Sequence, residues 1–244
     1  MHRRVAPLLV ISLAVAVAGC VSGPTGASGG TAATSAAPTS AAAPSSSIAP
    51  TTAPTAAHVP SGHLALPSRF EIELDPGRYW SSPPFEIGFS FVVDQRGWIA
   101  GHLNAEFFDI QRDADGGGPE WPQSILGWGL PAFVRGDRDI AVADLTPSEA
   151  VAELQARPSL GASNVVELEL FGRPSVRIDL HPLVQSPVFG GPGGTFSAGP
   201  PLDARVIFVP YEQRLLVVLL QSGVGDLEAR WVEALPILES VELS

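Results

Sequence analysis

A 42-residue stretch without aromatic or charged side chains separates the start of this chain from the part that can fold. Residues 21–62 consist almost entirely of Ser, Thr, Ala, Gly and Pro. Such a composition buries too little apolar surface to offset the entropy lost when the backbone is ordered. We therefore expect residues 20–62 to form a disordered tether and residues 63–244 to form one globular domain, a usual length for a single domain.

The segment before the tether has the order of a secretory signal. Two arginines precede an apolar run from Val5 to Ala18, and the run leads to Cys20, the only cysteine. The run spans 14 residues, whereas a membrane-spanning helix needs about 20. Residues 1–19 are therefore predicted to be a signal peptide that is removed on export.

The last four residues of that segment, Val17-Ala18-Gly19-Cys20, resemble the lipobox of bacterial lipoproteins. The resemblance implies that the peptide is cut before Cys20 and that acyl chains such as palmitate are attached to this residue. More than one chain anchors a protein stably to a bilayer. We therefore expect a lipoprotein of the cell envelope, held on the extracytoplasmic face of the cell membrane through lipidated Cys20. With no second cysteine to form a disulfide, the domain must be held by its core alone.

The charge of the chain excludes one class of partner. The formal net charge is −11, and it becomes −13 when the two signal-peptide arginines are removed. The remaining arginines are scattered, and the chain has no lysine. Phosphate binding requires a basic stripe, so no nucleic-acid partner is expected. An acidic surface of this kind keeps a protein monomeric.

Alternating apolar residues predict strands in the first half of the domain. We expect strands at 70–74 and 85–91, where apolar and polar residues alternate. A hairpin turn over 94–97 is expected to lead into a strand at 98–100, followed by a strand at 107–110. Because these segments are joined by short turns, the first half of the domain is predicted to be an antiparallel sheet.

One helix and one hairpin follow. Thr146-Pro147-Ser148-Glu149 has the pattern of a capping box with proline at the first helical position, which predicts a helix start. Apolar residues alternate with charged ones over 166–170 and 176–180, on either side of a turn. We expect the two apolar sets of this hairpin to share one face and the charges to pair on the other.

The last part of the chain predicts a second hairpin and a terminal helix. The hairpin joins 205–209 to 215–221, and its apolar run Leu215–Leu220 is typical of a central strand covered on both faces. Asp226 is expected to cap a helix that Pro236 bends or ends. Residues 241–243 are predicted to add a short final strand.

This order of elements resembles the PsbP-like α/β sandwich. The resemblance depends on the element order, the Thr146 helix start and the closing segment Pro236-Ile237-Leu238-Glu239-Ser240-Val241. It implies an α+β fold, an antiparallel sheet with helices packed on it. The family includes photosystem subunits and bacterial lipoproteins, so the likeness implies binding or assembly rather than catalysis. The Pro/Gly-rich stretch 181–204 interrupts the pattern and is expected to be a loop, either a binding lid or disordered.

Catalytic signatures are weak in this sequence. The Gly-x-Ser-x-Gly pattern of a nucleophile elbow does not occur. Asp179 and His181, two apart on one strand, could orient each other as a base and its partner, but no serine is marked as their nucleophile. The histidines also lack the spacing of zinc ligands. We therefore expect no catalysis, no metal site and no cofactor.

Two tryptophans are the remaining candidates for a binding surface. Trp121 and Trp128 flank a Gly- and Pro-containing segment and could line a ligand cleft or a partner surface. The alternative is a small hydrophobic cluster under a loop. We expect the domain to serve in protein docking or envelope assembly. The alternative is solute binding by Trp121, Trp128 and the 181–204 loop, and the third reading is hydrolysis at Asp179 and His181.

Overall fold

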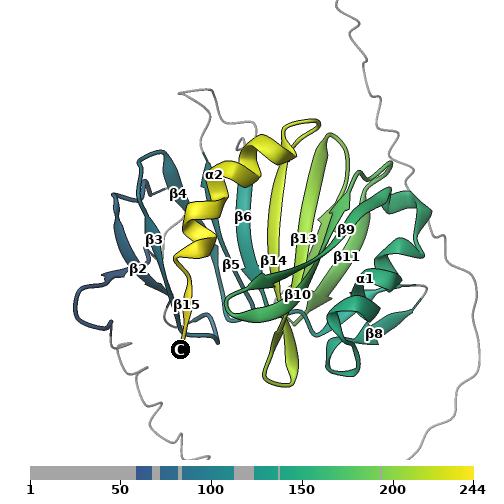
Figure 1. The fold of residues 1–244 in the computed structure, drawn as a ribbon, viewed down its shortest axis with the longest axis horizontal. Helices are drawn as coiled ribbons and strands as arrows, with labels where there is room; N and C mark the ends of the chain where they lie inside the picture. Colours follow the sequence, from purple (N-terminus) through teal and green to yellow (C-terminus); the bar gives the residue numbers. More distant parts are fainter. Residues whose placement is uncertain (1–58, 68–71, 82–83, 113–123, 137, 193) are drawn as a thin grey trace, which may run out of the picture. The chain divides into compact units, whose positions relative to one another are not determined.

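A computed structural model describes residues 59–67, 72–81, 84–112, 124–136, 138–192 and 194–244. Residues Thr52–Ser244 form one compact unit. The described part of this unit is an α+β structure of mostly antiparallel strands with two α-helices (Figure 1). Both hydrophobic clusters of the described residues lie inside this unit.

Seven antiparallel strands form the central sheet, in the order β4-β5-β6-β14-β13-β10-β9. Their bounds are β4 Trp98–Leu103, β5 Phe107–Arg112, β6 Ser124–Gly129, β9 Ala162–Leu170, β10 Arg173–Leu180, β13 Leu202–Tyr211 and β14 Arg214–Gly223.

Two four-stranded sheets and two α-helices accompany the central sheet. The first small sheet has the order β1-β2-β3-β15 and the second the order β12-β11-β7-β8. The strand bounds are β1 Leu64–Ala65, β2 Gly77–Ser81, β3 Phe89–Val93, β7 Phe133–Arg135, β8 Asp139–Ala141, β11 Ser186–Gly191, β12 Gly194–Ala198 and β15 Glu242–Leu243. The helices are α1 Pro147–Gln155 and α2 Leu227–Glu239, and two 3-10 turns span Val142–Asp144 and Pro158–Leu160.

The middle of the central sheet is buried on both faces, as β14 shows most clearly. Leu216, Val218 and Leu220 belong to one hydrophobic cluster, together with α2 and the strands β2 and β3. The alternate residues of β14 belong to the other cluster, together with α1, β7 and β11. Side chains of a strand alternate between faces, so an apolar run over 215–220 requires cover on both sides. The predicted central strand is confirmed.

The helix starts follow the sequence signals to different degrees. The Thr146 hydroxyl accepts from the backbone N–H of Glu149, and the Glu149 carboxylate accepts from the Thr146 N–H at 2.7 Å, so the predicted capping box is confirmed. Asp226 stands at the N-cap of α2 but makes no side-chain capping bond. Pro236 lies inside α2, which continues to Glu239, so this proline does not end the helix. Proline removes one N–H, and the rest of the turn remains intact.

Several sequence expectations for strands were wrong in detail. The strand expected over 85–91 begins only at Phe89, although Phe85 and Ile87 are buried as the alternation suggested. The turn over 94–97 does not form a hairpin, because β3 and β4 belong to different sheets. Of the strand expected over 70–74, residues 70 and 71 lie outside the described part, and Glu73 forms an isolated bridge to Ile99.

The β9–β10 hairpin forms, but its side chains are arranged differently from the expectation. Val176 lies opposite Glu167, and Arg177 lies opposite Val166. Residues directly opposite in an antiparallel pair share a face. The apolar residues of β10 therefore lie on the same face as the glutamates of β9, and the apolar residues of β9 lie on the same face as Arg177. The turn sets this register, and a difference of one residue reverses the faces.

The stretch 181–204 was expected to be a loop, and this expectation was wrong. Within it, β11 and β12 pair as an antiparallel hairpin, and β11 also pairs with β7. Glycine permits this arrangement, since an added Cβ at Gly190 would come within 2.9 Å of the Gly194 carbonyl oxygen. The glycines of this stretch suggested a loop. In the structure their lack of side chains instead lets the backbones of β11 and β12 approach closely.

None of the helices in the described part of the chain has the length and apolar character required to cross a membrane.

Candidate functional site

A cleft of about 260 Å³ lies between the end of the β4–β5 hairpin and the end of the β11–β12 hairpin. We call it the hairpin cleft. It lies where the central sheet meets a small sheet, and the β6–β7 connection forms its third side. Its described lining residues are His102, Asn104, Glu106, Phe107, Gly129, Leu130, Pro131, Phe189, Gly190, Gly191, Gly194, Thr195 and Phe196.

The turn between β4 and β5 is held in one conformation by a side-chain cap. Asn104 Oδ1 accepts hydrogen bonds from the backbone N–H groups of Glu106 at 2.9 Å and Phe107 at 2.8 Å. The Glu106 carbonyl in turn accepts from the Leu130 N–H at 2.7 Å. These bonds connect the turn to the β6–β7 connection and hold the backbone of Glu106 beside the end of β6.

Glycines bring the walls of the cleft together. A Cβ added at Gly127 would lie 2.8 Å from Phe107 Cζ, so the Phe107 ring lies directly over the backbone of β6. A Cβ added at Gly191 would lie 2.7 Å from a carboxylate oxygen of Glu106. The Glu106 carboxylate therefore lies against β11, across the cleft from its own turn.

Aromatic rings form much of the apolar lining. Phe189 and Phe196 face each other across the β11–β12 hairpin with ring centroids 4.7 Å apart and planes inclined by 22°. Together with Phe107, they give the cleft three rings beside a small number of polar groups. This combination is typical of small-molecule sites.

A histidine–aspartate pair borders the cleft. His102 Nδ1 lies 3.1 Å from Asp109 Oδ2, and the Gln111 side-chain amide donates to Asp109 Oδ1 at 3.1 Å. Asp109 is buried whereas His102 is largely exposed. Burial raises the pKa of the Asp109 carboxyl, although the bonds from Gln111 and His102 oppose the rise. The pair holds the imidazole ring in one orientation at the edge of the cleft.

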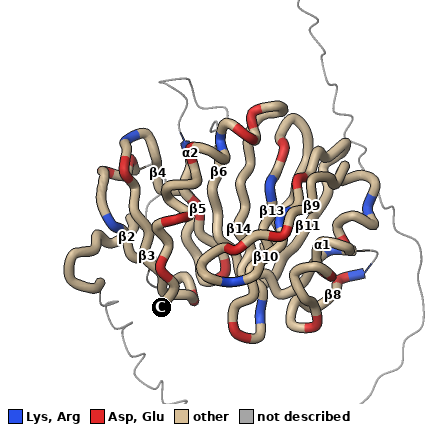
Figure 2. The backbone as a smooth tube through the Cα atoms, in the orientation of Figure 1, with Lys and Arg blue, Asp and Glu red and all other residues tan. Residues whose placement is uncertain are grey.

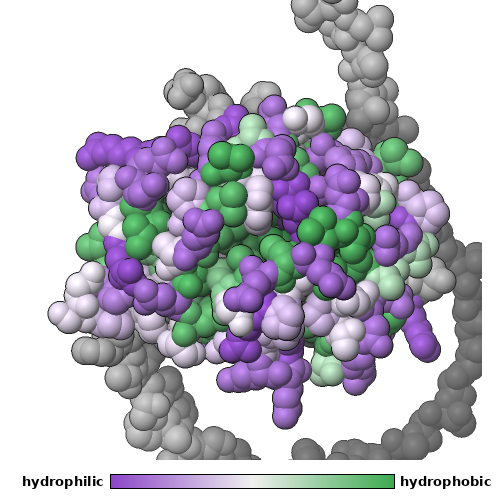
Figure 3. All heavy atoms as spheres, viewed as in Figure 1, coloured by the Kyte–Doolittle hydropathy of each residue, from purple (hydrophilic) through white to green (hydrophobic). Residues whose placement is uncertain are grey.

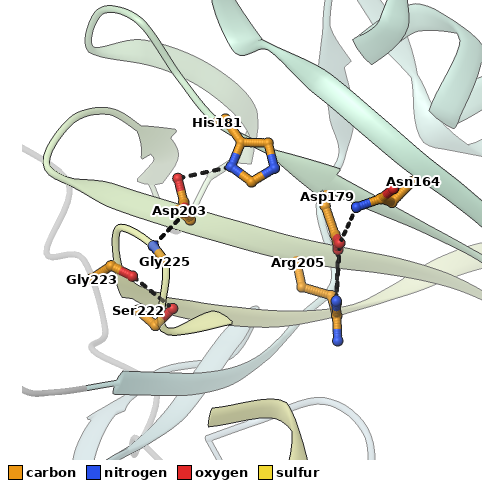
Figure 4. A network of polar contacts seen from close by, with 8 residues as sticks. All are labelled: Asn164, Asp179, His181, Asp203, Arg205, Ser222, Gly223 and Gly225. Carbon is orange, nitrogen blue, oxygen red and sulfur yellow. Dashed lines mark hydrogen bonds and ion pairs between the residues drawn. The ribbon is translucent and has the colours of Figure 1, made fainter. Parts of the chain in front are cut away.

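Figure 4 shows where Asp179 and His181 lie, and they do not orient each other. His181 Nδ1 lies 3.0 Å from Asp203 Oδ1, and Asp203 also accepts from the Gly225 N–H. Asp179 instead faces Arg205, the residue directly opposite it on β13. The base-and-partner arrangement suggested by their spacing is therefore absent from this structure.

Asp179 and Arg205 form a buried ion pair with two hydrogen bonds. Arg205 Nε donates to Asp179 Oδ1 at 2.7 Å, and Nη2 donates to Oδ2 at 2.9 Å. Burial disfavours the charged carboxylate, but the bonds from Arg205 and Asn164 outweigh burial and lower the pKa of Asp179 below its ordinary value. The Arg205 guanidinium also lies over the Trp231 ring of α2, at 5.0 Å from its centroid. The pair therefore joins β10, β13 and α2, which is a structural role.

Of the two tryptophans predicted to line a binding surface, only Trp128 belongs to the described residues. Trp128 is fully buried, and its ring stacks on Phe108 with centroids 5.0 Å apart. The structure therefore places Trp128 in the core rather than at a cleft, because β6 is a central strand and this position faces the first hydrophobic cluster. Trp121 lies outside the described residues, as do Cys20 and residues 21–58 of the predicted tether.

A second cavity, of about 630 Å³, lies near the start of β13 and the end of β14. Its described lining includes Gln185, Gln221, Arg230 and two prolines, and none of these described residues is aromatic. The hairpin cleft has the more specific lining, because rings and polar groups converge there. Across the described residues, no group of three or more His, Cys, Asp or Glu side chains is arranged to hold a metal ion.

The hairpin cleft was missed by reasoning from the sequence. His102 and Asp109 are seven residues apart on two strands, and their contact depends on the register of the β4–β5 hairpin. The glycines of β11 suggested a loop, and Phe196 lies within that stretch. The sequence carried one signal for this site. An asparagine directly before a strand, such as Asn104, is typical of a turn in which the side chain accepts hydrogen bonds from the backbone N–H groups that follow it.

The fold and the site together define an α+β protein of mostly antiparallel sheets, with a small cleft lined by both aromatic and polar side chains. No known protein family matches the sequence. No curated protein matches it either. Among solved structures, the chain is similar to cyanobacterial PsbP (CyanoP) from Synechocystis sp. PCC 6803, at 12% identity and a TM-score of 0.34, over 68% of this chain and 91% of that one. A likeness of this size carries no argument about function.

Proposed function

We propose that this chain is an exported lipoprotein, anchored by lipidated Cys20 to the extracytoplasmic face of the cell membrane, whose domain is a binding module without catalytic activity. The signal peptide, the lipobox and the tether composition support the anchor. For the domain we propose a PsbP-like α/β sandwich. The mostly antiparallel sheet and the two helices are compatible with this fold.

The hairpin cleft is the observation that supports binding. It has three aromatic rings, polar side chains from Asn104, Glu106 and Thr195, and walls joined by backbone hydrogen bonds. A pocket that is formed before its ligand arrives loses little entropy on binding. Solute binding, moved from the two tryptophans to this cleft, is the function that the geometry supports best.

Thermal unfolding of residues 52–244 with a panel of small solutes tests this proposal. A ligand present at 100 times its Kd adds about 2.7 kcal/mol to stability, which raises the Tm of a domain of this size by about 5–10 °C. Thr195→Trp, in the cleft wall, should abolish the shift, whereas Val165→Trp on the exposed part of β9 should preserve it. A shift that survives Thr195→Trp, or no shift with any solute, would contradict binding in the cleft.

Protein docking is a second candidate, favoured by two exposed side chains on an edge strand. β9 pairs only with β10 among the described residues, and its Val165 and Val166 are 43% and 40% exposed. Figure 3 shows hydrophobic residues at the surface over β9 and over α2. A photo-crosslinker at Val165 should capture one envelope protein, and one at Val232 of α2 serves as the matched control. Equal capture from both positions, or from neither, would argue against docking at β9.

The anchor has its own test. Labelling of living cells with a palmitate analogue should mark the wild-type chain and not the Cys20→Ser variant. Labelling that persists in the variant would refute lipidation at this residue.

A further inference from the structure

β9 is the last strand at one edge of the central sheet. Among the described residues it pairs only with β10, whereas each inner strand of this sheet pairs on both sides. Residues 164–169 of β9 are exposed, apart from Leu168, which is partly buried. An exposed edge presents N–H and C=O groups on which another strand can pair. The edge of β9 is therefore a candidate surface for an extended segment of another molecule.

The β9–β10 turn determines which backbone groups of β9 point to this edge. Residues 171 and 172 form a two-residue turn, and both have positive φ. The pair that flanks such a turn exchanges two hydrogen bonds, and every second pair along the strands repeats this pattern. The N–H and C=O groups of Glu167 and Glu169 therefore point away from β10. Pro174 lies opposite Glu169 and fits this pattern, because proline has no N–H to donate.

The same two residues make the edge of β9 negative. Glu167 and Glu169 are exposed and lie on one face of the sheet, which they share with Val176 and Pro174 of β10. Neither carboxylate forms an ion pair with another described residue. Figure 2 shows acidic residues on β9. Opposite charges on neighbouring strands stabilise their pairing and like charges oppose it, so an added strand should carry basic side chains on this face.

The other face of β9 is apolar. Val166 is 40% exposed, and Leu168 packs in part against the first hydrophobic cluster. Val166 lies opposite Arg177, whose guanidinium is 6.0 Å from the Trp231 ring centroid, so this face is on the side of α2. An added strand gains by covering Val166 and Leu168 with apolar side chains. The edge therefore suits a segment that is basic on one face and apolar on the other.

We propose that β9 binds an extended segment of a partner protein, in which basic and apolar residues alternate, as an additional edge strand of the central sheet. This inference rests on the docking function proposed for β9. The basic side chains lie opposite Glu167 and Glu169, and the apolar ones lie beside Val166. The register irregularity before Val166 restricts the regular edge to 166–170. A second copy of this chain suits the edge less well, because it presents the same glutamates and a negative net charge.

Two synthetic peptides test the chemistry of the partner. The basic peptide is Thr-Val-Lys-Val-Lys-Val-Thr with blocked ends, and the acidic peptide has Glu in place of both lysines. Each is labelled with a fluorophore and titrated with residues 52–244, with anisotropy as the readout. The basic peptide should bind about 2–30-fold more tightly, the factor expected for two cross-strand charge pairs. Equal binding, or tighter binding of the acidic peptide, would overturn the proposed chemistry.

Two double variants separate the charge of β9 from the charge of the whole domain. Glu167→Lys with Glu169→Lys should reverse the preference, so that the acidic peptide binds more tightly. Glu73→Lys with Glu239→Lys makes the same change in net charge at exposed positions outside β9 and should retain the preference for the basic peptide. The same response in both double variants would indicate that the peptides respond to net charge alone, which would contradict binding at β9.

N-methylated peptides test backbone pairing on the unaltered domain. Methylation of the two lysine nitrogens removes the N–H donors on one edge of the basic peptide, and methylation of the last two valine nitrogens removes donors on the other edge. Only one edge of an added strand faces β9, so one pattern should abolish binding and the other should retain it. Loss with the lysine pattern indicates antiparallel addition, and loss with the valine pattern indicates parallel addition. Loss with both patterns, or with neither, would refute strand addition.

The outcomes also separate this inference from the docking function on which it rests. Capture of one envelope protein by the crosslinker at Val165, without binding of either peptide, would overturn the strand inference and leave docking intact. Absence of both capture and peptide binding would overturn both. Sedimentation of residues 52–244 should show a monomer. A dimer that Glu167→Lys with Glu169→Lys abolishes would indicate that a second copy occupies β9, which contradicts a basic partner.

Discussion

Replacement of Arg205 by methionine should unfold this domain at a much lower temperature. The Arg205 and Asp179 side chains are each only 3% exposed, and two hydrogen bonds of 2.7 and 2.9 Å join them. Without the guanidinium, the Asp179 carboxylate stays buried and keeps the hydrogen bond from Asn164, at 3.3 Å, and the electrostatic attraction of Arg177. Loss of one partner from a buried pair costs about 3–5 kcal/mol.

The size of the domain converts this cost into a measurable shift. At about 2–4 °C per kcal/mol, Arg205→Met should lower the Tm by roughly 6–20 °C, to be measured by calorimetry and by urea unfolding. The loss of the guanidinium contact with Trp231, at 5.0 Å, adds to the cost. The third partner, Glu228, is 75% exposed and should contribute little.

Two further variants show whether the buried charge is the cause. A double variant with Asp179→Leu and Arg205→Met removes both charges and should be more stable than Arg205→Met alone, because no carboxylate is left unpaired. Arg96→Met breaks an ion pair with Asp75 whose side chains are 71% and 76% exposed, so it should cost about 0–1 kcal/mol. A loss below about 1 kcal/mol for Arg205→Met, or a double variant no more stable than the single one, would refute this reasoning.

Two other residues offer tests of the same kind. Burial raises the pKa of Asp109, so its contribution to stability is present below the ordinary aspartate pKa of about 3.9 and is lost as pH rises through the raised value. Asp109→Asn should therefore gain stability relative to the wild type as pH increases across that range in urea titrations, and a difference independent of pH would contradict this. Trp128→Ala should cost about 3–5 kcal/mol because it empties a fully buried site, and a loss below 1 kcal/mol by urea unfolding would show that the ring is not part of the core.

The cleft and the buried ion pair differ in what their variants should change. The ion pair lies in the central sheet against α2, where it affects stability. The hairpin cleft lies at the end of the β4–β5 hairpin, where Thr195→Trp in its wall should affect binding more than folding. Because the two sites have different readouts, a loss of ligand binding in Thr195→Trp can be separated from a loss of structure.

Local patterns in the sequence predicted the local structure well. The capping box at Thr146 forms because its bonds join residues three apart, and no distant contact is needed. The run Leu215–Leu220 is a central strand because six successive apolar side chains require cover on both faces of a sheet. The composition of the Ser/Thr/Ala/Pro stretch predicts that the foldable part begins after it, because such a stretch has no core to bury, and this boundary stays a prediction.

Tertiary structure decided the pairing and therefore the site. The spacing of Asp179 and His181 suggested that they form a pair. The β10–β13 register instead places Asp179 opposite Arg205, and His181 contacts Asp203. The glycines after Phe189 have loop composition, and only contact with β7 and β12 makes them a strand. Register and sheet assignment depend on residues far apart in the chain, and periodicity along one segment carries no information about them. For this reason the sequence determined local features such as the capping box and the buried central strand, whereas the tertiary structure alone brought Glu106, Phe107 and Phe196 to one cleft.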